Sequence, residues 1–524
     1  MPDSSETRTG ERVAVWLLPV LVAMYAVWVG RDANWDLLNY HYYNVKAWLE
    51  GRVTTDLAFG QLQTLFNPLL QLPLYLGMER LPPRVYAALL GFVQGLNLVI
   101  VWSLARAVWP ATGALRTTGP FLVAAAAGTG AAFLTEVGTS FGDTILSIFV
   151  FAALRLIVAA FQAPARASRW LLIAGLCGGV AVGLKPLAGI YAIALGAAVL
   201  ALPGSIEIRA TRIVLLGLGG AAGVLVSAGW WYAFVWRLTG NPLFPYYNDI
   251  FQSPLYWPER FVFTYFLPKT WLDAIFYPWI WLLNPQRVSE MRFVNLAIPG
   301  LMTLVAFLGL ARVLGLKPLG VGQTNPLVRA LAAFWMVAYV LWLTQSSVYR
   351  FAIVLESLAP LLIVALLARW VPAALQASRI VLVLVPIVVV TWPANFGRYA
   401  FTNDYMAMSP VSVPPNTMVA VAGWAPLSYV AIAFPPDTTF VRIQSNMHGF
   451  ADRPNGTDGL AASKLAAHRG PIRLLLAEPE WNIAQPLLDH YRYKVTREEC
   501  QVVDGTLAGG GGAGRLNLCP LGIQ

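Results

Sequence analysis

Charged residues are scarce in this sequence of 524 residues. Lys, Arg, Asp and Glu together make up 12%, about half of the roughly 25% that is usual in soluble proteins. Hydrophobic residues reach 57%, and the mean hydropathy is +0.60. This composition excludes an ordinary soluble protein and favours a protein that crosses a membrane several times.

The residues and motifs of several common active sites are also missing. The sequence has only four His and three Cys residues, without metal-ligand spacing, and no HExxH, P-loop, strand-linked GxGxxG or Ser-His-Asp pattern occurs. The net charge of +10 does not indicate a nucleic-acid partner, because Lys and Arg are scattered between apolar runs. That distribution is typical of loops at a membrane surface.

Apolar runs long enough to cross about 30 Å of hydrocarbon recur along residues 1–395. We expect a polytopic α-helical membrane domain of about eleven transmembrane helices, near 13–30, 84–105, 120–135, 143–161, 170–184, 187–203, 213–235, 295–311, 329–345, 351–368 and 379–395. The first run lacks a small-residue cleavage motif, so we expect a retained span and not a signal peptide.

The short loops between alternate spans are basic. They carry Arg106 and Arg116, Arg166 and Arg169, Arg209 and Arg212, Arg312 and Lys317, and Arg369 and Arg379, after Arg8 and Arg12 at the start. The positive-inside rule makes these loops cytoplasmic, and an odd number of spans then places everything after residue 396 outside. We expect a bacterial inner-membrane protein with a cytoplasmic N-terminus and a periplasmic C-terminal domain.

The composition changes in 396–524, where a small extracytoplasmic α/β domain is expected. Short strand candidates alternate with helix-like segments: the strands are Met418–Ala422, Thr439–Ile443 and Ile472–Ala477, and the helices are Pro426–Phe434, Leu460–His468 and Ala484–Tyr491. The glycine run 509–512 is interpreted as a flexible hairpin loop between two last strands.

Two of the three cysteines flank that glycine run. The strand candidates Cys500–Val503 and Arg515–Cys519 can pair as an antiparallel hairpin, and a periplasm would allow Cys500 and Cys519 to form a disulfide. Closing such a loop stabilises a domain by about 3 kcal/mol in the chain-entropy description. The alternative is that both thiols are reduced and merely packed. Cys177, in an apolar run, is expected to be a packing residue.

The segment directly behind the first span, residues 32–43, is acidic and aromatic. Carboxylates are costly near hydrocarbon, so a functional site is the default hypothesis at this boundary. From Asp36 to Glu50 the residues fit a helix, with Gly51 just past its end.

On such a helix Asp36, Tyr40 and Tyr43 share one face. An acid with two phenols along one stripe can bind a sugar and abstract a proton, and His41 lies beside them. The alternative is that Asp36 caps the helix start while the tyrosines lie at the lipid interface.

Glu136 and Asp143 lie in a very short connection between two spans, and so close to the membrane surface. Such a pair can hold a divalent metal, orient a donor phosphate through an ion, or position an acceptor. The alternative is that Asp143 caps the next span and Glu136 is simply solvated.

Two cations and one tyrosine are expected at the same outer face. Lys185 stands before Pro186, which ends the preceding helix, and Arg350 lies in a turn between spans. Each can bind a lipid-linked phosphate or snorkel to lipid headgroups. Tyr246, in the turn-rich loop after the seventh span, can stack on a sugar, line an isoprenoid groove or belong to an interfacial belt.

Taken together, these segments resemble the GT-C class of membrane glycosyltransferases, and most closely its bacterial protein mannosyltransferase and aminoarabinose transferase type. Four elements in order carry the resemblance: Asp36 with Glu50-Gly51-Arg52, the stretch 136–143, the glycine-rich run 175–186 that includes Lys185, and the turn 240–245. The first loop departs from the group because Leu37 follows Asp36, where an adjacent Asp-Glu pair is common. This leaves the identity of the base and of any metal open.

The resemblance implies that a sugar moves from a polyprenyl-phosphate donor to a hydroxyl of a lipid, glycan or protein acceptor, with inversion. We therefore expect Asp36 as the general base, with Glu136 and Asp143 also catalytic, and substrate binding by Tyr40, His41, Tyr43, Lys185, Tyr246 and Arg350. No cofactor is certain, a divalent metal is an option, and no nucleic acid is expected.

Two other interpretations stay open. A transporter or flippase of a lipid-linked glycan would place charges deep within spans, whereas most charges here lie at span ends, with Arg155 the main exception. A binding protein would work through its outer domain, where the sequence reveals no site.

Overall fold

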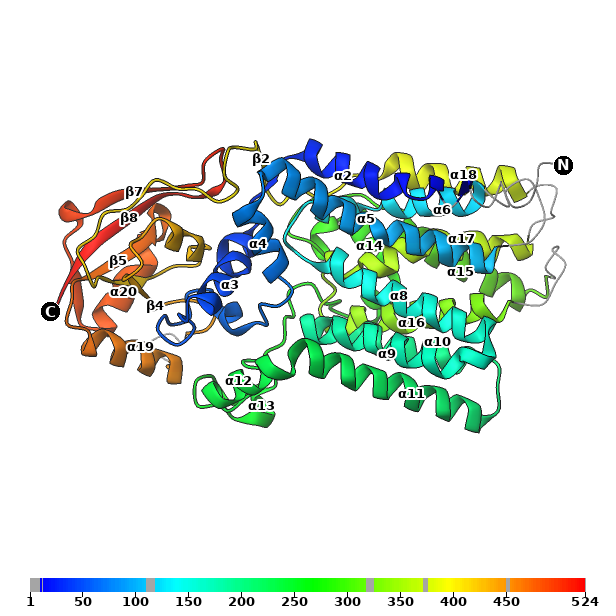
Figure 1. The fold of residues 1–524 in the computed structure, drawn as a ribbon, viewed down its shortest axis with the longest axis horizontal. Helices are drawn as coiled ribbons and strands as arrows, with labels where there is room; N and C mark the ends of the chain where they lie inside the picture. Colours follow the sequence, from blue (N-terminus) through cyan, green and yellow to red (C-terminus); the bar gives the residue numbers. More distant parts are fainter. Residues whose placement is uncertain are drawn as a thin grey trace.

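The computed structural model describes residues 10–11, 13–109, 118–316, 325–370, 376–448 and 453–523. The molecule is elongated, with a helical bundle at one end, a sheet domain at the other and helices of the first long loop between them (Figure 1). Helix α2 (Leu17–Val29) near the start of the chain lies in the bundle, and strand β8 (Gly512–Ile523) near its end lies in the sheet domain (Figure 1). Arg8, Arg12, Arg116 and Lys317 of the basic loops lie outside the described residues.

The bundle consists of apolar helices. Its main members are α2 (Leu17–Val29), α5 (Pro83–Val108), α6 (Thr118–Gly128), α8 (Asp143–Gln162), α9 (Ala167–Leu184), α10 (Gly189–Ala201), α11 (Ile206–Val224), α12 (Trp230–Thr239), α14 (Trp271–Leu283), α15 (Ala297–Val313), α16 (Pro326–Gln345), α17 (Ile353–Trp370) and α18 (Gln376–Val390). Six helical stretches in the described ranges are long and apolar enough to cross a membrane. They are Pro83–Val108, Asp143–Gln162, Pro164–Leu184, Ile206–Thr239, Pro326–Gln345 and Tyr349–Ala368. The chain is thus a multi-pass membrane protein, and the total of about eleven spans stays a prediction.

The glycine-rich run forms α9, which packs very closely against α11. A Cβ at Gly175 would lie 2.1 Å from the carbonyl oxygen of Leu216, and one at Gly179 would lie 2.0 Å from that of Gly220. Small residues let helix backbones approach inside a membrane, where association depends on close packing. This contact fixes the end of α9, where Lys185 adopts an extended conformation before Pro186.

The terminal domain is a sheet in the order β4-β3-β5-β8-β6, with β7 also paired to β8. The strands are β3 (Met418–Val421), β4 (Thr439–Arg442), β5 (Ile472–Ala477), β6 (Tyr493–Val495), β7 (Gln501–Thr506) and β8 (Gly512–Ile523). Strand β3 pairs in parallel with β4 and β5, whereas β8 is antiparallel to β5, β6 and β7. The prediction of a small C-terminal α/β domain is confirmed.

The helices of this domain differ from the predicted ones at their ends. They are α19 (Gly456–Ala467) and α20 (Trp481–His490), and the helix expected at Pro426–Phe434 is only a 3-10 turn, Ser428–Ile432. Successive strand residues point to opposite faces. Val419 and Val421 therefore pack toward Phe59 of the first loop, and Met418 and Ala420 pack under α19 and α20.

Cys500 and Cys519 are joined by a disulfide, as predicted, and Cys177 is a half-buried free thiol. The glycine run does form the hairpin between β7 and β8, but it is packed instead of free. A Cβ at Gly510 would lie 2.6 Å from the Tyr399 ring.

The glycine run also ties the terminal domain to the first loop. The buried Arg31 guanidinium donates to the carbonyl oxygens of Ala508 at 3.0 Å and Gly510 at 2.5 Å. Next to it, β1 (Arg31–Asp32) pairs antiparallel with β2 (Arg398–Tyr399), which follows the last helix of the bundle. The loop that carries Asp36 is thus held from both domains. The division of the chain at residues 395 and 396 stays a prediction.

Candidate functional site

Two carboxylates and two cations from four distant segments meet at the end of the bundle that faces the terminal domain. Arg350 Nη1 lies 2.7 Å from Asp36 Oδ2, and Lys185 Nζ lies 2.6 Å from Asp143 Oδ1. The two pairs are neighbours, because the Phe351 ring contacts both cations, at 4.6 Å from Lys185 Nζ and 5.1 Å from the Arg350 guanidinium carbon. Four of the predicted site residues therefore form one cluster.

The local fold of the first loop decides which of its side chains reach this cluster. Asn34 caps the helix start, since its Oδ1 accepts the backbone N–H of Leu37 at 2.9 Å, and Asp36 makes no capping bond. The chain then forms a π-helical turn, Leu37–His41, before α3 (Tyr42–Leu49). The capping alternative for Asp36 is wrong, and Asp36 is left to pair with Arg350.

The π-helical turn also separates Tyr43 from Asp36 and Tyr40. A π turn adds a residue to the helical repeat, so the expected shared face does not form. The Tyr43 hydroxyl donates to Asp56, and its ring packs edge-on against Phe59 in the core shared with the terminal domain. Tyr43 therefore packs away from the charged cluster, and its role in substrate binding stays a prediction without a supporting contact.

Tyr40 and Tyr246 are brought together through Phe66. The Phe66 ring centroid lies 5.7 Å from that of Tyr40 and 5.8 Å from that of Tyr246. Asn241 holds the turn before Tyr246 by donating to its carbonyl oxygen at 3.0 Å. Both tyrosines thus belong to one aromatic wall beside the charged cluster.

His41 is positioned by a buried network that sequence reasoning missed. Its Nδ1 lies 3.0 Å from Ser140 Oγ, and Asp32 Oδ2 accepts the backbone N–H of Ser140 at 2.8 Å. Asn34 donates to both carboxylate oxygens of Asp32. Burial lowers the pKa of His41 to about 3, so the imidazole is neutral at pH 7. Asp32 could have been singled out as the second acid of the first loop, but its partner lies 108 residues away.

The charge of Asp36 reflects two opposing influences. Burial alone would raise the pKa of its carboxyl, but the Arg350 guanidinium, with a smaller contribution from Lys185, holds that pKa below its usual value. Asp36 is therefore ionised at neutral pH. Removal of the Arg350 contact would leave burial as the stronger influence and raise the pKa.

The two cations do not reach out to lipid headgroups. The Lys185 and Arg350 side chains are only 18% and 20% exposed and point to carboxylates, and the Arg350 guanidinium also lies over the Phe141 ring at 4.3 Å. The snorkelling alternative is therefore wrong for both residues.

The capping alternative, with Asp143 as the cap and Glu136 solvated, is wrong for both acids. The fully buried Glu136 caps α8, since its Oε2 accepts the backbone N–H of Thr144 at 2.9 Å, while Asp143 makes no cap and pairs with Lys185. Burial raises the pKa of the Glu136 carboxyl well above its usual range, and the nearby Asp143 carboxylate adds to the rise. Glu136 therefore acts as a positioning group at the start of α8.

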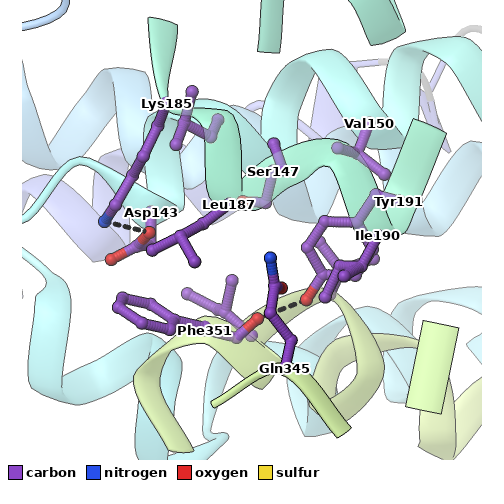
Figure 2. A pocket seen from close by; sticks show the side chains of 13 residues that line it. Asp143, Ser147, Val150, Lys185, Leu187, Ile190, Tyr191, Gln345 and Phe351 are labelled. Atoms are coloured by element: carbon purple, nitrogen blue, oxygen red, sulfur yellow. Dashed lines mark hydrogen bonds and ion pairs between the residues drawn. The ribbon is translucent and has the colours of Figure 1, made fainter. Parts of the chain in front are cut away.

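A pocket opens from the Asp143–Lys185 pair into the bundle (Figure 2). It lies between α8, α10 and the start of α17, and the Gln345 amide points into it (Figure 2). Its wall is otherwise mainly apolar and is formed by Leu146, Val150, Leu187, Ala188, Ile190, Phe351, Ile353 and Val354, with Ser147 and Tyr191 as further polar members. The pocket thus offers charge at one end and an apolar surface at the other.

The acidic side chains do not form a metal site in this arrangement. Among the residues that the structure describes, no three His, Cys, Asp or Glu side chains converge as metal ligands. Asp36 and Asp143 each have a cation as partner, and Glu136 caps a helix. This donor set does not fit a divalent ion, and no step is derived through one.

No family model and no curated protein matches this sequence. Among solved structures, the apo oligosaccharyltransferase of Archaeoglobus fulgidus is similar with a TM-score of 0.50 and 12% identity, over 91% of this chain and 70% of that one. The same enzyme with zinc and sulfate gives 0.44 and 12%, over 87% and 67%. ArnT from Cupriavidus metallidurans bound to undecaprenyl phosphate gives 0.41 and 15%, over 98% of both chains.

The first of these likenesses shows the fold. The chain shares its fold with the archaeal oligosaccharyltransferase, and this fold agrees with the resemblance of its motifs to the GT-C class. The order of the four sequence elements in the chain is consistent with this fold.

Proposed function

We propose that this protein is a membrane glycosyltransferase that moves a sugar from a polyprenyl-phosphate donor to an acceptor hydroxyl on the periplasmic side. The observation that carries the proposal is the paired cluster of Asp36 with Arg350 and Asp143 with Lys185 at the mouth of an apolar pocket. The GT-C fold is consistent with this function.

The cations suit a phosphate. Arg350 offers a guanidinium fork and Lys185 a point charge, and both are already held in a partly desolvated place, where positive charge strongly stabilises a leaving phosphate. The apolar side chains beside the cations would face the start of the lipid tail behind that phosphate. Donor binding would place phosphate oxygens where carboxylate oxygens now contact the two cations.

The replacement of the Asp36 carboxylate by the donor phosphate at Arg350 would make Asp36 a stronger base. When the donor phosphate takes Arg350, Asp36 loses its main cationic partner, and the pKa of the buried carboxyl rises toward that of a useful base. In the free protein the same pair keeps both buried charges compensated, which avoids the cost of an unpaired ion. The donor thus activates the residue that its reaction needs.

The transfer is a single inverting displacement. The acceptor oxygen forms a bond to the anomeric carbon while the bond from that carbon to the phosphate oxygen breaks. The lipid phosphate leaves with the electron pair, and the acceptor proton moves to Asp36. General base catalysis of this kind contributes about 10²–10⁴-fold. Tyr40, His41 and Tyr246 line the side of the cluster where the sugar would lie.

The direct test is incubation of the purified protein with a panel of polyprenyl-phosphate sugars and candidate lipid, glycan and protein acceptors. Release of the lipid phosphate, dependent on the acceptor, is the expected result. If no donor in the panel is turned over while the protein moves a lipid-linked glycan across proteoliposome membranes, the flippase interpretation replaces this one.

A further inference from the structure

The carboxyl ends of the parallel strands β3, β4 and β5 meet at one edge of the terminal sheet. The chain runs from β3 to β4 on one side and then to β5 on the other, so the strand order reverses at β3. In open α/β sheets this switch point, at the carboxyl ends, is where ligands bind. The edge also faces the first outer loop, because Leu62 N–H donates to Asn446 Oδ1 at 2.9 Å.

The turn after β3 and the turn after β5 are locked together at this point. Glu480 Oε1 accepts the backbone N–H groups of Trp424 at 2.7 Å and Ala425 at 3.1 Å. Gly423 has φ +100°, and a Cβ there would lie 2.0 Å from Glu480 Oε2. Only glycine allows the carboxylate to lie against this turn.

Several polar atoms at this edge lack a hydrogen-bond partner among the described residues. They are Glu480 Oε2, Gln444 Nε2 and Arg442 Nε. The Arg442 and Gln444 side chains are almost fully buried, at 0% and 1% exposure. Gln444 Oε1 accepts the N–H of Gly423 at 2.7 Å, which places its amide beside the same turn. An unsatisfied buried polar group is costly, and three such atoms lie together at this switch point.

The chemistry of these atoms selects the class of ligand. The carboxylate oxygen accepts hydrogen bonds, and the amide and guanidinium nitrogens donate them. Trp424, whose backbone N–H is bound by Glu480, is 42% exposed. An aromatic face with a few fixed polar groups suits a ring that has both apolar faces and hydroxyls. The carboxylate of Glu480 disfavours a phosphate. We infer that Trp424, Glu480 and Gln444 form a saccharide-binding site in the terminal domain.

This edge is connected to the segment that carries Asp36. Gln61 Nε2 lies 3.2 Å from both Asn39 Oδ1 and the Trp424 carbonyl oxygen, and Ser428 donates to the carbonyl oxygen of Asn39. Asn39 directly precedes Tyr40 in the π-helical turn. A saccharide held at Trp424 would therefore lie beside the transfer site, as an acceptor glycan must. That assignment as acceptor rests on the proposed function, whereas the binding itself does not.

Binding is tested without any donor, on the full-length protein in lipid nanodiscs, because maltoside detergents carry a competing sugar. Maltose, cellobiose and mannobiose serve as probes in saturation-transfer NMR. We expect transfer to at least one of them, and a loss of affinity of about tenfold or more in Trp424→Ala and Glu480→Gln. Glu478→Gln is the matched control, since that carboxylate lies on the same turn but contacts Asn517 and Arg515.

Absence of binding for all three sugars at millimolar concentration would overturn the inference. So would binding that both Trp424→Ala and Glu480→Gln retain in full. Asp36→Asn should bind the same sugar as the wild type, because no transfer is involved. Failure of the transferase assay would therefore leave this result intact, and failure of sugar binding would leave the transferase assay intact.

Discussion

The transfer site in the bundle and the strand edge of the terminal domain are both buried polar clusters, but they handle charge differently. In the bundle, two carboxylates compensate two cations. At the strand edge, Arg442 is held by the backbone carbonyl oxygens of Gly423 and Ala425, and Glu480 by backbone N–H groups. The first arrangement suits an anion that can replace a carboxylate, and the second suits a neutral ligand rich in hydroxyls. The difference agrees with the two proposed ligands, a donor phosphate in the bundle and a saccharide at the strand edge.

The largest expected effect concerns the charge of the bundle site. Asp36→Asn keeps the shape and removes the base, so turnover should fall by about 10²–10⁴-fold while the protein still folds and binds donor. The rate of lipid-phosphate release measures this. Asp249→Asn is the control, because it alters an exposed carboxylate that also pairs with an arginine. Near-normal turnover in Asp36→Asn would remove Asp36 as the base.

The second effect belongs to the terminal domain alone. Reduction of the Cys500–Cys519 disulfide, or the double change of both residues to Ser, should destabilise that domain by about 3 kcal/mol. The expected readout is a lower melting temperature of the terminal domain with the bundle transition unchanged. Non-reducing peptide mapping of protein from the native membrane should find the bridge. If both cysteines are free there, the periplasmic placement of the domain is also in doubt.

The third effect distinguishes the binding of the donor from the binding of the acceptor. Lys185→Ala removes a charge-assisted contact worth about 1.5–3 kcal/mol, so the KM for donor should rise by roughly tenfold or more, with a smaller change in the KM for acceptor. Lys46→Ala, which breaks an exposed pair with Glu50, is the matched control. Equal changes in both constants would assign Lys185 a structural role only.

The smallest effect is a dependence of stability on pH that both regions share. Burial lowers the pKa of His41 and of His448 to about 3 in the folded protein, whereas an unfolded histidine has a pKa of about 6.5. The unfolded state then binds more protons, so stability falls as the pH drops below 6.5. Each histidine should lower the free energy of unfolding by about 1.4 kcal/mol at pH 5.5 relative to neutral pH.

Replacement of His448 by Gln should therefore reduce the difference in melting temperature of the terminal domain between pH 7.5 and pH 5.5. His490→Gln, an exposed change on α20, should leave that difference as it is. An unchanged pH dependence in His448→Gln would show that the imidazole is not held neutral by burial.

Much of the architecture could be predicted because its signals are local. Apolar runs predict helices in a membrane. The alternation of short strands and helices predicts the terminal domain, and the positions of Cys500 and Cys519 predict its disulfide. The basic loops predict that four residues lie on one side of the membrane, namely Asp36, Asp143, Lys185 and Arg350. In the structure these residues form two ion pairs in one cluster.

The features that could not be predicted from the sequence depend on contacts between segments that are distant in the chain. The π-helical turn that redirects Tyr43 has no signature in the spacing of the residues. Asp32 accepts the backbone N–H of Ser140, and Glu480 accepts that of Trp424. Neither partnership could be predicted from the sequence, because the partners lie far apart in the chain. The polar cluster at the strand edge has no sequence signature, because its residues follow three separate strands, one or two after each.

In the proposed mechanism, Asp36 and Asp143 pair with Arg350 and Lys185 until a donor phosphate replaces them. The most direct measurement is the affinity of the purified protein for undecaprenyl phosphate without a sugar, compared between the wild type, Asp36→Asn and Arg350→Ala. We expect Asp36→Asn to bind at least as tightly as the wild type, since a competing carboxylate is gone, and Arg350→Ala to bind more weakly. Weaker binding by Asp36→Asn, or unchanged binding by Arg350→Ala, would contradict it.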